Sequence, residues 1–113
     1  MSISFVNKHG APVSVCLVWY NPDCSNPPFR KSGWLNLASG AGGVFLNGAY
    51  RNKYFYFYAE ASDGSYWGDP RFHAAVINNR FDTCFDTIFD PNRIVPLNEI
   101  DTGGAVNFTV NLL

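Results

Sequence analysis

Short apolar runs recur along the whole chain, and clusters of Gly, Pro, Asn and Asp separate them at short intervals. Runs rich in β-branched and aromatic residues between such turn residues are typical of a β-sandwich or β-barrel. We therefore predict an all-β fold, a single-domain antiparallel β-sandwich over residues 1–113 with about eight or nine short strands. The predicted strands cover residues 2–7, 13–20, 33–37, 43–47, 54–61, 65–68, 71–77, 93–97 and 105–112.

Residues 54–60 show the clearest alternation in the chain. Successive side chains of a strand point to opposite faces, so this run has one phenylalanine face and one tyrosine face. We expect Phe55 and Phe57 to lie in the core. The opposite face would be a half-exposed ladder with rings roughly 7 Å apart. Its members are Tyr54, Tyr56 and Tyr58.

Turn residues predict how several strands connect. The pair Asp63-Gly64 between two aromatic runs is a strong hairpin signal, and it should bring Tyr66 and Trp67 back beside the tyrosine-bearing strand. Residues 8–12 form a hairpin-length connection between the first two predicted strands. The last predicted strand alternates cleanly, and because only one of its faces is apolar we favour antiparallel pairing there.

Two segments are expected to be irregular. Residues 21–28 contain three prolines and several Asn and Asp residues, which remove strand hydrogen bonds and favour turns, so we predict a surface loop. Residues 79–90 are ambiguous, because Phe81, Phe85 and Phe89 repeat every four residues, which fits a short amphipathic helix or a strand. Asp and Thr are poor helix formers, and we favour a loop with one helical turn.

The composition is that of a folded protein with little charge. Of the 113 residues, 47% are apolar and 15% are charged, which excludes intrinsic disorder. The net charge is −1 and the eight Lys and Arg are scattered, so we expect neither nucleic acid nor an anionic membrane as a partner. No stretch is long and apolar enough to insert into a membrane, and no leader is visible. We expect a cytoplasmic protein, or an exported one whose leader has been removed.

The three cysteines have different surroundings. Cys16 lies in an apolar strand and is expected in the core. Cys24 and Cys84 lie in polar stretches and could form one bridge in an oxidising compartment. None of the three has the spacing of a metal site, and we expect no cofactor.

Three motifs occur in a fixed order: GWLNLASG at residues 33–40, YFYFYAE at residues 54–60 and DGSYWG at residues 63–68. Together they resemble a small bacterial family of unknown function, the domain-of-unknown-function family numbered 1036. The resemblance extends from residues 5–8 to residues 99–112 and so covers almost the whole chain.

The resemblance implies an exported, cysteine-bearing protein, with cysteines where this chain has Val6 and His73 and another near Gly42. Of that pattern only Cys84 is present here. This difference argues against the family's disulfides in this chain and favours a cytoplasmic protein. The resemblance implies no catalytic residue and no substrate.

An aromatic surface is the best candidate for a binding site. Sugar rings stack their C–H faces on aromatic rings, and phenol and indole edges supply hydrogen bonds, so such a surface suits carbohydrate. The competing interpretation is that neighbouring side chains cover these rings, which then only stabilise the sheet. Trp67 and Asp69 lie beside turn residues and are expected to be the most exposed. The full candidate set is Trp34, Tyr54, Tyr56, Tyr58, Tyr66, Trp67 and Asp69.

Carboxylates offer two weaker alternatives. A glycosidase needs two acids across a cleft, and Glu60 with Asp82 or Asp86 could supply them, although nothing in their spacing selects such a pair. A calcium site could use Asp63, Asp69, Asp82, Asp86 or Asp90, but no DxDxDG loop is present. We therefore predict no catalytic residue and no metal ligand.

The sequence favours a non-enzymatic binding module that offers its aromatic surface to a small neutral ligand such as a glycan. The first alternative is a structural or assembly protein that buries this surface, or an uncapped edge strand, against a partner or another copy in a homo-oligomer. The second alternative is a small hydrolase that uses Glu60 and an aspartate.

Overall fold

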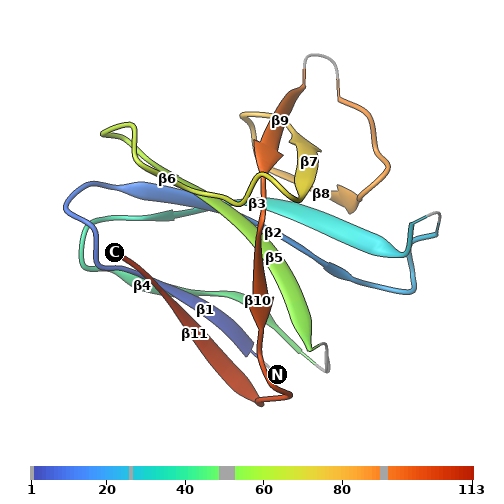
Figure 1. Ribbon diagram of the computed structural model, residues 1–113, viewed down its shortest axis with the longest axis horizontal. Coiled ribbons are helices and arrows are strands. Elements are labelled where there is room, and N and C mark those ends of the chain that lie inside the picture. Colours follow the sequence, from blue (N-terminus) through green and yellow to red (C-terminus); the bar gives the residue numbers. More distant parts are fainter. Residues whose placement is uncertain (1, 26, 49–52, 90–91) are drawn as a thin grey trace.

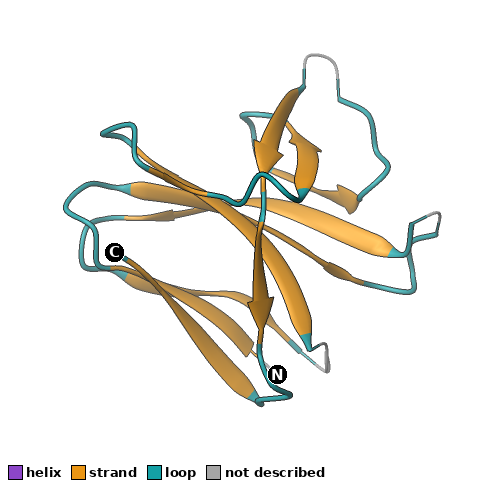
Figure 2. Cartoon of the chain, viewed as in Figure 1, coloured by secondary structure: helices purple, strands orange, loops and turns teal. Residues whose placement is uncertain are grey.

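The computed structural model describes residues 2–25, 27–48, 53–89 and 92–113, and within these ranges the regular structure is entirely β-strand (Figures 1 and 2). The strands are β1 (Ser2–Asn7), β2 (Val13–Tyr20), β3 (Phe29–Leu37), β4 (Gly42–Asn47), β5 (Tyr54–Ala61), β6 (Tyr66–Trp67), β7 (His73–Val76), β8 (Phe81–Cys84), β9 (Arg93–Pro96), β10 (Asn98–Asp101) and β11 (Asn107–Leu112). No helix in the described part of the chain has the length and apolarity needed to cross a membrane.

The strands form three sheets. The main sheet has the order β10-β5-β2-β3-β8, with β6 paired to β5, and a second sheet has the order β11-β1-β4. The small sheet β7-β9 lies above the main sheet in the view of Figure 1, and the β11-β1-β4 sheet lies below it. The predicted all-β sandwich is confirmed.

The first face of the main sheet packs on the β11-β1-β4 sheet. Alternate side chains of β2 and β5 point into this layer, so Phe55 and Phe57 are buried, as predicted. The ring of Phe57 lies 5.3 Å from that of Phe5 on β1, in an edge-to-face arrangement. Aromatic contacts across the two sheets therefore hold this layer together.

The second face of the main sheet is covered in its middle by β7 and β9, which we call the covering sheet. The buried residues of this layer are Cys16, Val18, Tyr58, Ala74, Val76, Phe81, Val95 and Leu97. Cys16 is only 1% exposed, which confirms its predicted place in the core, and burial raises the pKa of its thiol to about 12. Its thiol is therefore protonated and unreactive at neutral pH.

Two side chains of β3 fasten the covering sheet and the segment after β8. Lys31 is fully buried, and its Nζ donates to the carbonyl oxygens of Ala75 at 2.6 Å and Thr87 at 2.9 Å. The indole of Trp34 donates to the carbonyl of Ile77 at 2.9 Å. These bonds fix the edge of the covering sheet against β3.

Among the described residues, the Lys31 ammonium forms no ion pair with a carboxylate. It lies 4.6 Å from the centre of the Phe89 ring and 5.7 Å from that of Phe85, within the range of cation–π attraction. Burial lowers the pKa of Lys31, and the more distant Asp86 partly offsets this effect. A buried charge costs stability unless its hydrogen bonds are made, so the bonds to these carbonyls must be retained.

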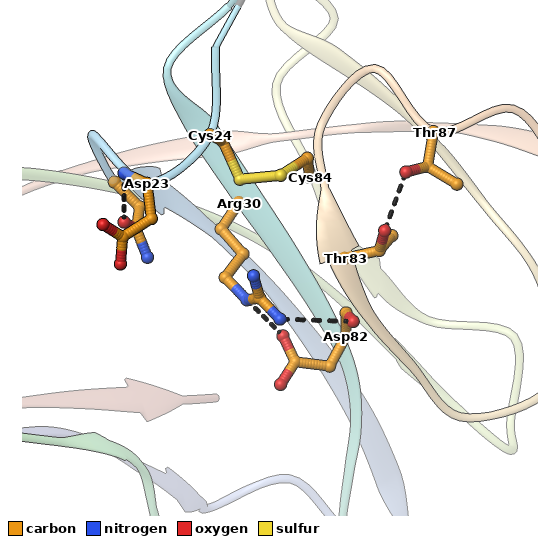
Figure 3. Close-up of a disulfide and its surroundings, with 8 residues drawn as sticks. Asp23, Cys24, Arg30, Asp82, Thr83, Cys84 and Thr87 are labelled. Carbon is orange, nitrogen blue, oxygen red and sulfur yellow. Dashed lines mark hydrogen bonds and ion pairs between the residues drawn. A yellow bond between two sulfur atoms is a disulfide. The ribbon is translucent and has the colours of Figure 1, made fainter.

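A disulfide joins Cys24 to Cys84, which confirms the proposed bridge (Figure 3). It ties residues 21–28, a loop as predicted apart from Asn26, which lies outside the described residues, to the end of β8. Beside it Arg30 donates to the carboxylate of Asp82 at 2.7 Å. The disulfide therefore holds the edge of the main sheet that adjoins the covering layer.

The hairpin predicted at Asp63-Gly64 is confirmed. Gly64 has a left-handed φ of +92°, and the amide of Ala61 donates to the carbonyl of Ser65 at 2.8 Å. Ala59 and Glu60 on β5 pair with β6. The turn therefore returns the second aromatic run beside β5.

Two predictions about strand pairing were wrong. β11 pairs with β1 in parallel, because a strand with one apolar face tells which side is buried but not the direction of its neighbour. β1 and β2 do not form a hairpin, since they lie in different sheets. Asn7 at the end of β1 is buried and donates to the carbonyls of Ala11 and Leu37, so residues 8–12 cross between layers instead.

Other boundaries also differ from expectation. The segment at 79–90 begins with β8 and continues as turn and coil, without the expected helical turn in its described residues. Its phenylalanines do share a layer, because Phe81, Phe85 and Phe89 all pack in the second core. The strand β10 was missed because Ile100 is its one apolar residue. β3 begins four residues earlier than predicted, at Phe29, because the buried Lys31 makes that part of the strand look polar.

The disulfide yields a stability prediction. Cys84→Ser removes a cross-link across a sequence separation of 60 residues, and we expect it to lower the free energy of unfolding by about 2 to 5 kcal/mol. Thermal denaturation followed by circular dichroism, with and without dithiothreitol, measures the effect. Reductant should lower the Tm of the wild-type protein and of Cys16→Ala but not of Cys84→Ser. Equal Tm values for wild type and Cys84→Ser under oxidising conditions would contradict the prediction.

Burial of Lys31 yields a pH prediction. The pKa of Lys31 in the folded protein lies below its ordinary value of 10.5. Between the folded and the unfolded pKa, the unfolded chain therefore binds more protons than the folded one. The free energy of unfolding should accordingly rise with pH across that range. Lys31→Met should lack this rise, and at neutral pH it should be less stable because two carbonyls lose their donor. Urea denaturation at several pH values compares both proteins with the exposed-site control Lys8→Met. An identical pH dependence in Lys31→Met and wild type would refute the assignment.

Candidate functional site

The second face of the main sheet is open beyond the covering sheet, and a polar row crosses it there. Ser14 on β2 is the cross-strand neighbour of Asn36 on β3 and of Glu60 on β5, and Glu60 is the neighbour of Tyr66 on β6. Cross-strand neighbours share a face, so four adjacent strands present these side chains together. Ser14, Asn36 and Glu60 form the floor of a cleft of about 420 Å³.

One wall of this cleft comes from β3 and from the segments around the covering sheet. Arg93 at the start of β9 donates to the carboxylate of Glu60 at 2.5 Å and to Oδ1 of Asn78 at 3.1 Å. Its guanidinium lies 5.8 Å from the ring centre of Trp34. Arg80 also lines the cleft, and its side chain is exposed.

Tyr58 supports this wall from within the core. It is only 7% exposed, its ring lies 6.3 Å from Trp34, and the Arg93 guanidinium lies 5.9 Å from its ring centre. Burial and the nearby Glu60 carboxylate raise the pKa of Tyr58. The hydrogen bond to Glu60 in turn raises the pKa of Arg93. The floor and wall are therefore held rigidly by an ion pair and packed rings.

The cleft continues along the sheet past the ends of β2, β3 and β5. A second hollow of about 460 Å³ shares Ser14, Asn36 and Glu60 with the first and extends to Pro12 and Ser62. The shared residues form a ridge of polar groups between the two hollows. A ligand longer than one ring could therefore lie across the row.

The opposite end of the second face has a different chemistry. A pocket of about 260 Å³ there is mostly apolar, and its lining residues are Val18, Pro27, Phe29, Tyr56, Phe72, His73, Phe85 and Leu97. The ring of Tyr56 lies 5.3 Å from Phe72, and its hydroxyl donates to Glu99 at 3.2 Å. Burial and the Glu99 carboxylate raise the pKa of Tyr56. The covering sheet therefore separates a polar cleft from an apolar pocket.

The structure does not assemble the predicted aromatic residues into one platform. Trp34 lines the polar cleft, with the Tyr58 ring against it and the Tyr66 ring beside Tyr58. Tyr56 lines the apolar pocket instead, and Tyr54 is 42% exposed. The even, half-exposed ladder is wrong, because exposure falls from Tyr54 through Tyr56 to the buried Tyr58. The covering sheet buries the inner end of the row.

Trp67 and Asp69 are less available than expected. Trp67 pairs with Ala59 and packs on the first core, so it lies on the face opposite to Tyr66, and its ring contacts His9 edge-on at 5.3 Å. The carboxylate of Asp69 is bound by the guanidinium of Arg71 at 2.7 Å, and this hydrogen bond lowers the pKa of Asp69. Neither residue reaches the cleft.

Glu60 and Asp82 are not brought together, and Asp86 does not line the cleft that contains Glu60. Asp82 pairs with Ser32, whose neighbour Leu17 points to the first face, so Asp82 faces away from Glu60. Three strand spacings, about 14 Å, also separate their strands. Within the described residues no three His, Cys, Asp or Glu side chains cluster as metal ligands, and Asp90 lies outside them.

Most residues of the polar cleft were not predicted from the sequence, namely Ser14, Asn36, Asn78, Arg80 and Arg93. A signal for the floor was present, since a single polar residue interrupts the apolar end of each of β2, β3 and β5. What the sequence did not show is that these three positions are neighbours across the sheet. The wall residues lie far away in the chain and had no such signal.

Comparisons with known proteins give no further assignment. No family model matches this chain, and no curated protein or solved structure does either. The resemblance to the family of unknown function therefore stays a prediction, and the candidate site stands on its own geometry.

Proposed function

We propose that this protein is a non-enzymatic carbohydrate-binding module whose site is the polar cleft. The observation that carries the proposal is the row of Asn36, Ser14 and Glu60 beside the Trp34 ring in an open hollow. A sugar presents hydroxyl groups to such polar side chains and C–H faces to aromatic rings. The cleft volume also falls in the range of about 300 to 1,000 Å³ that is usual for small-molecule sites.

The position of Glu60 favours binding over hydrolysis. An acid that protonates a leaving group is kept neutral by an apolar environment, and glycosidases carry a second carboxylate across the cleft. Glu60 instead forms an ion pair with Arg93, and it is the one carboxylate among the described residues that line the cleft. It therefore serves to hold Arg93 and to accept hydrogen bonds.

The disulfide supports the exported alternative over the cytoplasmic one. Disulfides form and persist in oxidising compartments and are rare where glutathione keeps thiols reduced. The bridge between Cys24 and Cys84 fits such a compartment, and the one remaining cysteine, Cys16, is buried. Glycans are also most abundant as targets outside the cell, so this placement is consistent with the proposed ligand.

Substitutions in the floor test the proposal. Asn36 is exposed, so Asn36→Ala should leave the fold intact. Loss of the hydrogen bonds from the Asn36 amide to the sugar should weaken sugar binding by roughly 3- to 10-fold or more. Two-dimensional NMR of the protein titrated with a panel of mono- and oligosaccharides measures affinity and location together. The matched control is Tyr54→Ala, an exposed aromatic at the far end of the same face. If the sugar-induced shifts map around Tyr54, or no sugar binds, the proposal fails.

The apolar pocket favours assembly as a second candidate function. Tyr20 is 47% exposed and Phe72 is 36% exposed. Their rings contact Phe29 and Tyr56, two partly buried aromatic residues that line the pocket. An exposed apolar patch of this kind is typical of a protein contact. A homo-oligomer formed there would leave the polar cleft open.

Light scattering of the purified protein tests this second function. If the pocket is a contact between copies, Phe72→Ser should shift the protein toward monomer, because a buried ring contributes more to an interface than its polar neighbours. Tyr66→Ser, which removes an exposed ring at the other end of the face, should leave the mass unchanged. A wild-type protein that is monomeric at high concentration would rule out the homo-oligomer.

A further inference from the structure

The hydrogen-bond acceptors of the cleft are largely occupied by the protein itself. Oδ1 of Asn36 accepts from the Ser14 hydroxyl at 2.6 Å, and Oδ1 of Asn78 accepts from Arg93 at 3.1 Å. Oε1 of Glu60 accepts from Arg93 as well. Each asparagine amide therefore keeps its two N–H donors, which bond to no residue in the described part of the chain. The cleft offers a ligand mainly donors.

Arg80 adds a charge that the described part of the chain does not neutralise. The other arginines of that part each pair with a carboxylate: Arg30 with Asp82, Arg71 with Asp69 and Arg93 with Glu60. No such ion pair involves Arg80 among those residues, and its exposed side chain lines the cleft. Two guanidinium groups face one carboxylate there, so the cleft has a net positive charge although the whole chain is slightly negative.

We infer that the sugar bound in this cleft carries a carboxylate, as in a uronic acid, and that Arg80 binds it; this inference rests on the proposed carbohydrate-binding function. The planar guanidinium matches a carboxylate with two parallel hydrogen bonds, and such charge-assisted bonds are about twice as strong as neutral ones. The free amides of Asn36 and Asn78 supply further donors to the acid or the ring hydroxyls. Trp34 then accommodates the ring face. The expectation of a neutral ligand came from the aromatic surface, and neither that surface nor the overall charge reports this local excess.

The test compares sugars that differ only at carbon 6. Galactose, galacturonate and galactose 6-phosphate, with the corresponding glucose and mannose series, are titrated into the isotope-labelled protein and followed by NMR. We expect a uronate to bind roughly 10-fold or more tighter than its neutral sugar, with shifts at the side-chain amides of Asn36 and Asn78. Added salt should weaken uronate binding but not binding of the neutral sugar.

Variants separate this inference from the proposed function. Arg80→Gln should reduce uronate affinity to that of the neutral sugar, whereas Arg71→Gln, an equal charge change outside the cleft, should have no effect. Equal binding of neutral and acidic sugars would overturn the carboxylate inference and leave the carbohydrate-binding function standing. Tighter binding of the phosphate than of the uronate would overturn the choice of carboxylate. Absence of binding by every sugar would overturn both proposals.

Discussion

The second layer of this protein depends on two donors that β3 sends across to backbone carbonyls, the Lys31 ammonium and the Trp34 indole. The covering sheet has only two short strands, β7 and β9, and so small a unit is marginally stable alone. Its position is fixed because buried carbonyls that lose their partners cost free energy. Where this sheet ends, the polar cleft begins on one side and the apolar pocket on the other, so these bonds set the limits of both.

The residues of β2 reflect its position between two packed layers. Its residues from Val15 to Trp19 are all buried, because one face meets the β11-β1-β4 sheet and the other meets the covering sheet. Ser14 is the point at which the cover stops, and a small polar residue suits a position that faces water across a sheet. The same change from apolar to polar occurs at Asn36 and Glu60, so the site is the uncovered part of an otherwise buried face.

β1, β2 and β5 could be predicted from local periodicity. A strand with one buried face shows alternating apolar and polar residues, and a strand with two buried faces shows a continuous apolar run. The face on which Trp67 lies could also have been predicted. Adjacent residues of a strand point to opposite faces, so Trp67 and Tyr66 cannot lie on the same surface. β10 could not be found in this way, since an edge strand such as Asn98–Asp101 needs few apolar residues. The wall of the cleft depends on where β9 docks, which is a property of long-range packing rather than of local sequence.

The parallel pair β1-β11 brings together the earliest and latest strands of this chain, with Ser2 bonded to Asn107 across 105 positions. Pairing of such distant segments requires closure of a very long loop, whose entropy must be overcome before any contact is gained. Until β11 pairs with it, β1 therefore has β4 on one side and an open edge on the other. An open edge is a template for pairing with other chains. The competition between β11 and other chains for that edge would then decide how much of the protein reaches its native state.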